Sequence, residues 1–302
     1  MICLAFRLLA PCLASARDEF FHRLSVNPVL MKPQNSGADQ IFQGTSAKPP
    51  RLPLSAVLIT LNAARQLPEC LASLAFCDEV VLVDAGSSDD TLAIAAEFGA
   101  HVIHQDWLGF GPQKQFAVNQ ASHDWVLCLD ADERISPQLR SSIEHALVTS
   151  PLPAIAAFRF ARCNRFMGRY LRHGEGYPDW SLRLFNRQYA QWSNDAVHEK
   201  VVCPTPVGQL RGDLLHDSAE TLGIYLSKQD RYTSLAAEEA LARGKHASLI
   251  HLILSPLVRF VKFYFVRLGF LDGWPGLVHI LIGCRNSYMK YAKMRAILAE
   301  RP

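Results

Sequence analysis

Short apolar runs alternate with helix-like spacing through the first half of the chain. The runs at 54–60, 79–83, 101–104 and 125–129 are rich in Val, Ile and Leu and do not alternate with polar residues. Uninterrupted runs of this kind are typical of strands covered on both faces. Helical periodicity falls between and after them, at 66–75, 91–98, 113–120 and 136–147. The pattern predicts β-α-β units and an α/β fold with a mostly parallel sheet flanked by helices.

The next hundred residues have a mixed pattern. An apolar run at 154–160 is followed by a loop rich in Gly, Tyr and His at 168–178 and by a predicted strand at 180–185. Residues 221–242 have the apolar spacing of a helix, and Gly244 predicts its end. We expect residues 51–243 to form the main domain.

The last sixty residues are apolar, aromatic and basic. The stretch 248–270 is long enough to span a membrane, but it contains Arg259, Lys262 and Arg267. At 100° per residue these cations fall within an arc of about 140°. We therefore expect 244–302 to form a basic amphipathic helical tail lying in the headgroup plane of a membrane. The alternative is an ordinary amphipathic helix pair that closes the sheet.

Composition and charge support a globular, membrane-associated protein. The chain has 302 residues, 49% hydrophobic, and a net charge of +3. That charge is unevenly distributed, because residues 244–302 carry +7 and the remainder −4. Aliphatic side chains outnumber stacking aromatic ones in the tail, which favours an anionic membrane surface as partner and no nucleic acid. Residues 1–50 are expected to be a loose N-terminal extension, with Met31 as an alternative start.

The eight cysteines form no C-x-x-C pair and no cluster with histidines. This spacing favours reduced thiols over a disulfide framework or a zinc site. Cys128 lies within an apolar run and is expected to be a small core residue.

Two acidic motifs follow predicted strands. The strand at 125–129 leads into Asp130 and Asp132, whose side chains point the same way if the backbone stays extended. Together they are expected to share a Mg²⁺ or Mn²⁺ ion that keeps positions open for diphosphate oxygens. Asp84 ends the strand at 79–83 and is placed to accept hydrogen bonds from a base or ribose, whereas Asp89 also suits a helix cap. Ligands of such sheets bind at these strand ends.

These motifs resemble those of family 2 glycosyltransferases with the GT-A fold. The resemblance covers residues 54–135 and includes Thr60-Leu61-Asn62, the segment V-D-A-G-S-S-D-D-T at 83–91, and D-A-D-E at 130–133. It implies a nucleotide diphosphate sugar donor and an inverting transfer. The residues that it implies for the donor are Asn62, Asp84, Lys114 and Asp130, with Asp132 for the metal. One departure is that Asn62 is followed by Ala63-Ala64-Arg65, without the acidic residue that many relatives carry.

Four shorter segments resemble the branch of that family that builds the lipopolysaccharide inner core. They are G-F-G-P-Q-K at 109–114, D-A-D-E at 130–133, R-L-F at 183–185 and V-H-E at 197–199. This resemblance implies transfer of a hexose, with glucose as first candidate, to a lipid-linked saccharide acceptor. The enzyme would then act on the cytoplasmic side, peripheral to the inner face of the cell membrane.

An inverting transfer needs a general base for the acceptor hydroxyl. Asp179 is the first candidate, because it precedes an R-L-F strand as in relatives, and Glu199 and His198 are the alternatives. Arg172, Arg183 and Arg187 are candidates for binding phosphate. Three other functions fit the sequence less well. A nucleotidyltransferase would need a Gly-rich loop after the first strand, a polyprenyl-phosphate transferase usually has clear spanning helices, and a non-catalytic scaffold would leave the acids unexplained.

Overall fold

The parallel strands predicted from the apolar runs form one half of a nine-stranded sheet in a computed structural model. The structure describes residues 52–149, 154–195, 199–218 and 221–299. Residues 49–302 form one unit, and the expected extension at 1–50 lies outside the described residues. The chain order of the elements is β1 (Leu52–Thr60), α2 (Leu67–Ser73), β2 (Cys77–Asp84), α3 (Thr91–Glu97), β3 (His101–His104), α4 (Phe110–Gln120), β4 (Trp125–Asp130), β5 (Glu133–Ile135) and α5 (Pro137–Thr149).

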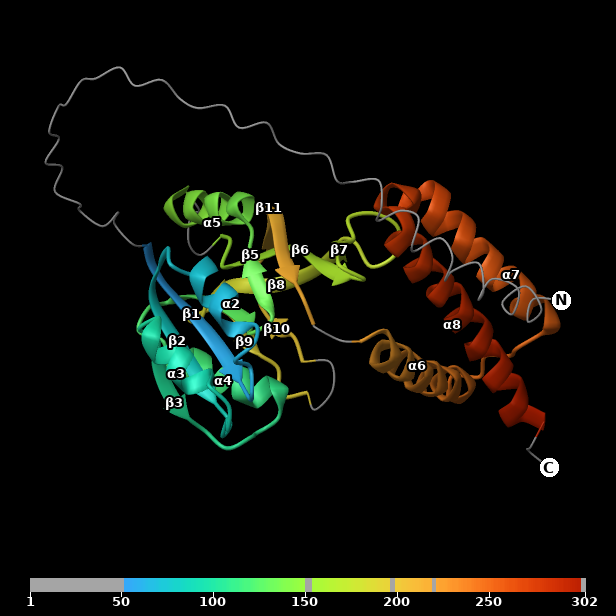
Figure 1. The fold of residues 1–302 in the computed structure, drawn as a ribbon, viewed down its shortest axis with the longest axis horizontal. Coiled ribbons are helices and arrows are strands. Elements are labelled where there is room, and N and C mark those ends of the chain that lie inside the picture. The colour runs from blue at the N-terminus through green and yellow to red at the C-terminus, as the bar shows by residue number, and fades with distance from the viewer. Residues whose placement is uncertain (1–51, 150–153, 196–198, 219–220, 300–302) are drawn as a thin grey trace, which may run out of the picture. The chain divides into compact units, whose positions relative to one another are not determined.

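The second half of the sheet is mainly antiparallel. It contains β6 (Ala157–Phe166), β7 (Arg169–Tyr170), β8 (Asp179–Asn186) and β11 (Val207–His216), while β9 (Gln191–Trp192) and β10 (Val201–Val202) form a separate pair. The sheet order is β3-β2-β1-β4-β8-β6-β11-β5, with β7 beside β6. Strands β3, β2, β1 and β4 are parallel, and β8 joins β4 to β6 with antiparallel pairing on both sides. The predicted α/β fold with helices on both faces is confirmed (Figure 1).

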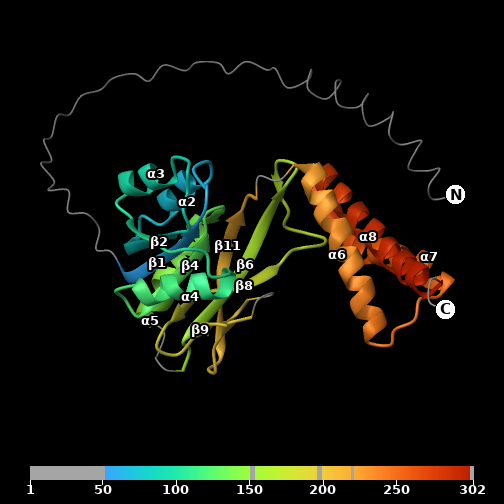
Figure 2. The same cartoon turned by 90° about the horizontal axis from the view of Figure 1, so that it is seen from below.

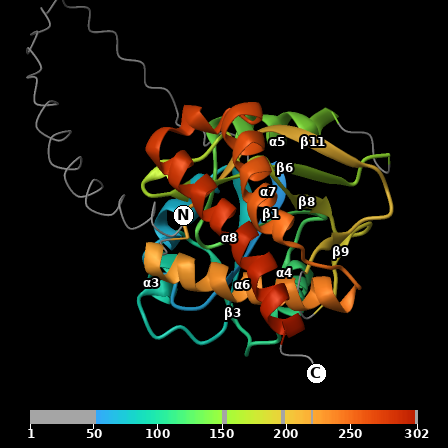
Figure 3. The ribbon, with the colours of Figure 1, turned by 90° about the vertical axis from the view of Figure 1, so that its right-hand side faces the viewer.

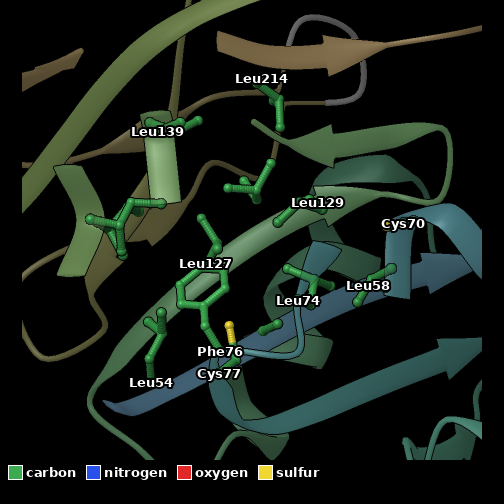
Figure 4. Close-up of a cluster of buried hydrophobic side chains, with 14 of the residues drawn as sticks. Leu54, Leu58, Cys70, Leu74, Phe76, Cys77, Leu127, Leu129, Leu139 and Leu214 are labelled. Atoms are coloured by element: carbon green, nitrogen blue, oxygen red, sulfur yellow. The ribbon is translucent and has the colours of Figure 1, made fainter. Parts of the chain in front are cut away.

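Alternate residues of the central strands enter two separate cores. Leu58, Leu82 and Leu127 face a cluster closed by α2, α3 and α5, whereas Val57 and Cys128 face a cluster closed by α4 and β9. Figure 4 shows part of the first cluster, in which leucines of β1 and β4 meet those of α5 and β11. Figure 2 shows helices on both sides of the strands. Cys128 is 2% exposed, as expected for a core residue, and the six described cysteines are all free thiols.

Three helices follow the sheet. They are α6 (Leu222–Ala242), α7 (Leu249–Phe260), which continues into a π-helix at Val261–Val266, and α8 (Gly273–Ala299). The Thr221 hydroxyl caps α6 by accepting from Ile224 N at 3.3 Å. Figure 3 shows α6 and α7 beside α8, and Ala237 and Ala240 of α6 pack with Met294 of α8. The tail is helical as predicted, while the domain boundary at 243 stays a prediction.

The sheet brings the acidic motifs to one edge. In the parallel register Thr60 lies opposite Asp84, and Ile59 lies opposite Asp130. The carboxyl ends of β1, β2 and β4 are therefore neighbours, which is where ligands of open α/β sheets bind.

Candidate active site

A chain of seven alternating charges runs across this edge of the sheet. Lys114 Nζ lies 3.2 Å from Asp130 Oδ1, and Arg183 Nη2 lies 2.8 Å from Asp130 Oδ2. Arg183 continues to Glu133, and Arg162 joins Glu133 to Asp179. At the other end Lys114 Nζ lies 3.3 Å from Glu199 Oε1. The members in order are Glu199, Lys114, Asp130, Arg183, Glu133, Arg162 and Asp179.

The middle of this ion-pair chain is buried. Glu133 is 0% exposed, and Lys114 and Arg183 are each 7% exposed, with Trp192 packed against both cations. Burial raises the pKa of the Asp130 carboxyl, but Arg183 and Lys114 outweigh it and hold that pKa well below its usual range. Burial raises the pKa of Glu133, and Asp130 adds to the rise against the opposing effect of Arg183. Asp130 is therefore a paired anion whose two oxygens are already in use.

Asp132 lies apart from Asp130 and contacts a histidine. It lies in the turn after β4, and its Oδ2 is 3.2 Å from Nε2 of His216, the last residue of β11. The other ring nitrogen of His216, Nδ1, is 2.7 Å from Asn164 Oδ1. Burial lowers the pKa of His216, but the hydrogen bond and charge of Asp132 outweigh it, so that the net pKa is raised. The expectation that Asp130 and Asp132 share a cation differs from this geometry, because β4 ends at Asp130 and the two carboxylates pair with different partners.

The residues around Asp132 fit a divalent cation with few protein ligands. Among the described residues there is no group of three or more His, Cys, Asp or Glu placed to hold a metal. Asp132 and His216 would therefore supply one oxygen and one nitrogen, and His216 is oriented through its second nitrogen as metal-binding histidines usually are. Mg²⁺ commonly binds one or two carboxylates and takes its other ligands from water and substrate phosphates.

A polar cavity of about 220 Å³ opens beside Asp132. Arg134 and Arg165, which line it, are paired with Glu69 and Asp217. The lining residues are Arg65, Gln66, Glu69, Asp132, Arg134, Arg165 and Asp217. Three guanidinium groups beside a candidate metal ligand give this cavity the chemistry to bind diphosphate oxygens.

Asn62 and Asp84 hold two loops together at the end of β1 and β2. The Asp84 carboxylate accepts hydrogen bonds from Thr60 Oγ1, Gly86 N, and both the N and Oγ of Ser87. Asn62 adopts a left-handed conformation with φ 52°, and its Oδ1 accepts from Ser88 N at 2.9 Å. Burial raises the pKa of Asp84, but the hydrogen bonds from Ser87 and Thr60 outweigh it and lower the net pKa. Four donors occupy the Asp84 oxygens, so in this geometry its carboxylate shapes the loop.

Asp179 opens β8 and borders a second cavity of about 310 Å³. Arg162 Nε donates to its Oδ2 at 2.9 Å. Asn164 lines the same cavity, and its side chain contacts His216. The cavity at Asp179 is thus connected through one side chain to the candidate metal ligands.

Glu199 lies at the opposite end of the ion-pair chain. Its carboxylate contacts Lys114 of α4, and a close approach of the two segments is possible because residue 111 is glycine. A Cβ on Gly111 would come within 2.3 Å of Ser193 O. The alternative base His198 lies outside the described residues.

Comparisons with known proteins show the family of this chain. The family described as glycosyl transferase family 2 matches residues 55–207. The chain belongs to glycosyl transferase family 2. It is 32% identical to the lipopolysaccharide core biosynthesis glycosyltransferase LpsC of Rhizobium meliloti, over 84% of this chain and 96% of that protein. An uncharacterized glycosyltransferase of Rickettsia typhi is 29% identical over 81% of this chain and 87% of its own.

Among solved structures, this transferase is similar to glucosyl-3-phosphoglycerate synthase from Mycobacterium tuberculosis. The match has 24% sequence identity and a TM-score of 0.32. It covers 37% of this chain and 44% of the synthase chain, so less than half of that protein is spanned.

The arginines expected to bind phosphate are engaged within this transferase. Arg183 lies between Asp130 and Glu133, and Arg172 Nη2 is 3.2 Å from Asp213 Oδ2. Arg187 donates to the backbone oxygens of α4. The cavity beside Asp132 instead contains Arg65, Arg134 and Arg165, of which Arg134 and Arg165 are also ion-paired, with Glu69 and Asp217.

His216 and Asn164 were not identified as site residues from the sequence. His216 ends a strand whose residues are half-exposed and interrupted by Gly208 and Gly212, so no apolar run marked the element. The available signal was Leu214-Leu215-His216-Asp217, in which apolar residues lead into ionisable ones as at Asp84 and Asp130.

Proposed function

We propose that this family 2 glycosyltransferase moves a hexose, with glucose as first candidate, from a nucleotide diphosphate sugar to a lipid-linked saccharide of the lipopolysaccharide core. The observation that carries the proposal is that Asp132 and Asp179 each line a cavity. His216 contacts Asp132, and Asn164, which lines the cavity at Asp179, contacts His216. The name of the Rhizobium meliloti relative supports the lipopolysaccharide acceptor.

The donor is assigned to the edge formed by β1, β2 and β4. Asp132 and His216 would hold Mg²⁺ or Mn²⁺, which when bound neutralises the charge that develops on the leaving diphosphate. Arg65, Arg134 and Arg165 would bind diphosphate oxygens in the cavity of about 220 Å³. Asn62 and Asp84 shape the loops that receive the nucleoside, and Lys114 fixes Asp130 beside the ribose.

Asp179 is proposed as the general base. Its Oδ2 is held by Arg162, and no described residue bonds its Oδ1, which leaves that oxygen to accept the proton of an acceptor hydroxyl. The acceptor oxygen then bonds to the anomeric carbon as the bond to the diphosphate breaks, and the electron pair leaves with the nucleotide. Glu199 is the alternative base, but its carboxylate is paired with the buried Lys114.

The tail is proposed to dock on the cytoplasmic face of an anionic membrane. Among the described residues, Leu249–Val266 is long and apolar enough to cross a membrane, with a mean hydropathy of 1.7. Ile250, Ile253 and Val266 are 66–72% exposed, and the tail carries a charge of +7. One expectation changes: Arg259 forms an ion pair with Glu175, so it is unavailable to a headgroup. The apolar side chains would enter the bilayer, and exposed cations of the tail would contact lipid phosphates.

A screen of nucleotide sugars tests the function. The purified chain is incubated with each donor and Mn²⁺, and release of the nucleoside diphosphate is measured with and without deacylated lipopolysaccharide core. We expect one donor to be turned over, with loss of activity in excess chelator and in Asp132→Asn. Activity that survives both excess chelator and Asp132→Asn would refute the metal assignment. Transfer to polyprenyl phosphate instead of core would indicate a polyprenyl-phosphate glycosyltransferase. Absence of donor and metal binding would favour a non-catalytic scaffold.

A further inference from the structure

The loop that leads to Asp179 is fastened to the C-terminal helices. Asp272, 2% exposed, accepts hydrogen bonds from the backbone N of Arg172 and of His173 at 3.0 and 2.8 Å. Gly174 N donates to Arg267 O at 2.8 Å, and Glu175 is ion-paired with Arg259. Four consecutive residues of the loop, 172–175, are therefore bound by the tail.

The loop at 172–175 and the tail are closely packed at two glycines. The backbones of Gly174 and Gly269 approach so closely that a Cβ on Gly174 would lie 3.1 Å from Gly269 Cα. A Cβ on Gly269 would come within 2.6 Å of Phe263 O. Two glycines thus allow the π-helical segment to lie directly against the loop, and Phe263 and Arg267 line the same cavity as Asp179.

The cavity at Asp179 is built from both parts of the chain. The sheet and its loop contribute Asp179 and Asn164, and the tail contributes Phe263 and Arg267. Its lining residues are Asn164, Gly174, Gly176, Tyr177, Pro178, Asp179, Phe263 and Arg267. A group seated there would touch the proposed base on one side and the tail on the other.

Arg267 brings an uncompensated positive charge to the rim of this cavity. Its guanidinium donates to Tyr177 O, and no carboxylate of the described chain forms an ion pair with it. The other guanidinium groups near the base differ, because Arg162, Arg183 and Arg259 are each paired with an acid. A cation held beside a cavity without a counter-charge favours an anionic ligand there.

We propose that this cavity is the acceptor subsite and that it selects a saccharide carrying an anionic substituent such as a phosphate. Arg267 binds the anion, the half-buried Phe263 ring packs against a sugar face, and the acceptor hydroxyl reaches Asp179. This assignment rests on the proposed transferase function and makes the tail part of the active site. It also suits a lipid-linked acceptor, because Phe265 and Val266 of the same segment are exposed apolar residues.

The test compares two acceptor probes in the full-length protein. Deacylated lipopolysaccharide core oligosaccharide is used as isolated and after phosphatase treatment, and binding is measured with Mn²⁺ and the nucleoside diphosphate of the donor that the screen identifies. We expect the phosphorylated probe to bind wild type about tenfold more tightly, the size expected of one charge-assisted contact. Arg267→Gln should remove that preference and Arg267→Lys should keep part of it. Phe263→Ala should weaken both probes alike.

Lys262→Gln is the matched control. Lys262 is exposed on the same segment but does not line the cavity, so its loss should leave the preference unchanged. Equal loss in Lys262→Gln and Arg267→Gln, or an unchanged preference in Arg267→Gln, would overturn the proposal. Metal-dependent binding of the nucleoside diphosphate of the donor that the screen identifies is measured in every variant. If wild type turns over no donor and binds no nucleoside diphosphate, the proposed function fails, whereas intact nucleotide binding with no effect of Arg267 defeats only the acceptor subsite.

Discussion

Arg162 donates from Nε and Nη2 to a single oxygen of Asp179, Oδ2, at 2.9 and 2.7 Å. The carboxylate is therefore held by one oxygen, no described residue bonds the other, and Asp179 lines a cavity. Because Arg162 is also paired with Glu133, the orientation of Asp179 depends on the buried ion-pair chain and not on Asp179 alone.

The base assignment predicts a specific kinetic defect. Asp179→Asn should lower kcat by about 10²- to 10⁴-fold, because proton removal occurs in the transition state. The Kd for the nucleotide donor should change little. Steady-state kinetics and donor titration measure the two effects, with Glu199→Gln assayed in parallel. If Glu199→Gln shows this pattern and Asp179→Asn does not, the order of the two candidates is wrong.

The metal assignment predicts that Asn164 raises metal affinity by orienting the His216 ring. Asn164→Ala removes the partner of His216 Nδ1 and should lower metal affinity by about 10- to 100-fold. The measurement is the Mn²⁺ concentration that gives half-maximal activity, together with Mn²⁺ binding in the absence of substrate. Rescue of kcat by added Mn²⁺ is expected in Asn164→Ala but not in Asp132→Asn. An unchanged Mn²⁺ requirement in Asn164→Ala would rule out this positioning role.

Arg183 is predicted to be needed for stability. Arg183→Met leaves Asp130 and Glu133 without their shared partner in a buried place, and it should lower the free energy of unfolding by about 3–5 kcal/mol. Urea unfolding monitored by circular dichroism measures the change. Arg243→Met is the control, because Arg243 pairs with Glu239 on an exposed helix surface and should cost less than about 0.5 kcal/mol. Similar losses in both variants would contradict a special role for the buried pairs.

Asp84 should make stability depend on pH. The pKa of Asp84 is lower in the folded chain than the value of about 3.9 expected for the unfolded chain. The carboxylate therefore makes its full contribution to folding stability at pH values above the unfolded pKa. The contribution is lost as pH falls through the folded pKa. Asp84→Asn should therefore be less stable than wild type at pH 7, by about 1–3 kcal/mol, and the gap should narrow below about pH 4. Denaturant unfolding at several pH values gives the difference, and a gap that stays constant would show that the carboxylate is not the cause.

The exposed face of α7 should bind lipid. Ile250→Asn combined with Ile253→Asn should reduce co-sedimentation with anionic liposomes, and high salt should release only part of the wild type, because apolar insertion is not screened. Leu235→Asn is the control, since Leu235 is an exposed apolar residue of α6. Equal pelleting of all three proteins would refute docking through α7.

The parallel half of the fold was predictable because each strand contains a short run rich in Val, Ile or Leu. The strands at 101–104 and 125–129 were placed within one residue, and Asp84 and Asp130 were found at strand ends. The strands of the antiparallel half were harder to predict from sequence. β11 is half-exposed and polar at alternate positions, so it has no such run.

The pairing of charges could not be predicted for a similar reason. Asp130, Arg183 and Glu133 are brought together by the neighbouring positions of β4 and β8, which depend on sheet order and not on local sequence. The tail was predicted as helical from its periodicity. That Arg259 and Arg267 face the loop at 172–177 follows only from tertiary packing.

Asp272 is translated long after the loop whose backbone it binds. It fixes the backbone of residues 172 and 173, although a hundred residues separate it from them along the chain. A ribosome that has completed the whole sheet has therefore made the strands, the proposed base and both proposed metal ligands, but not the residue that fastens the loop before that base. Domains fold largely as they emerge, N-terminal parts first. A nascent chain would thus carry an assembled sheet with an incomplete proposed acceptor subsite until its last helices are translated.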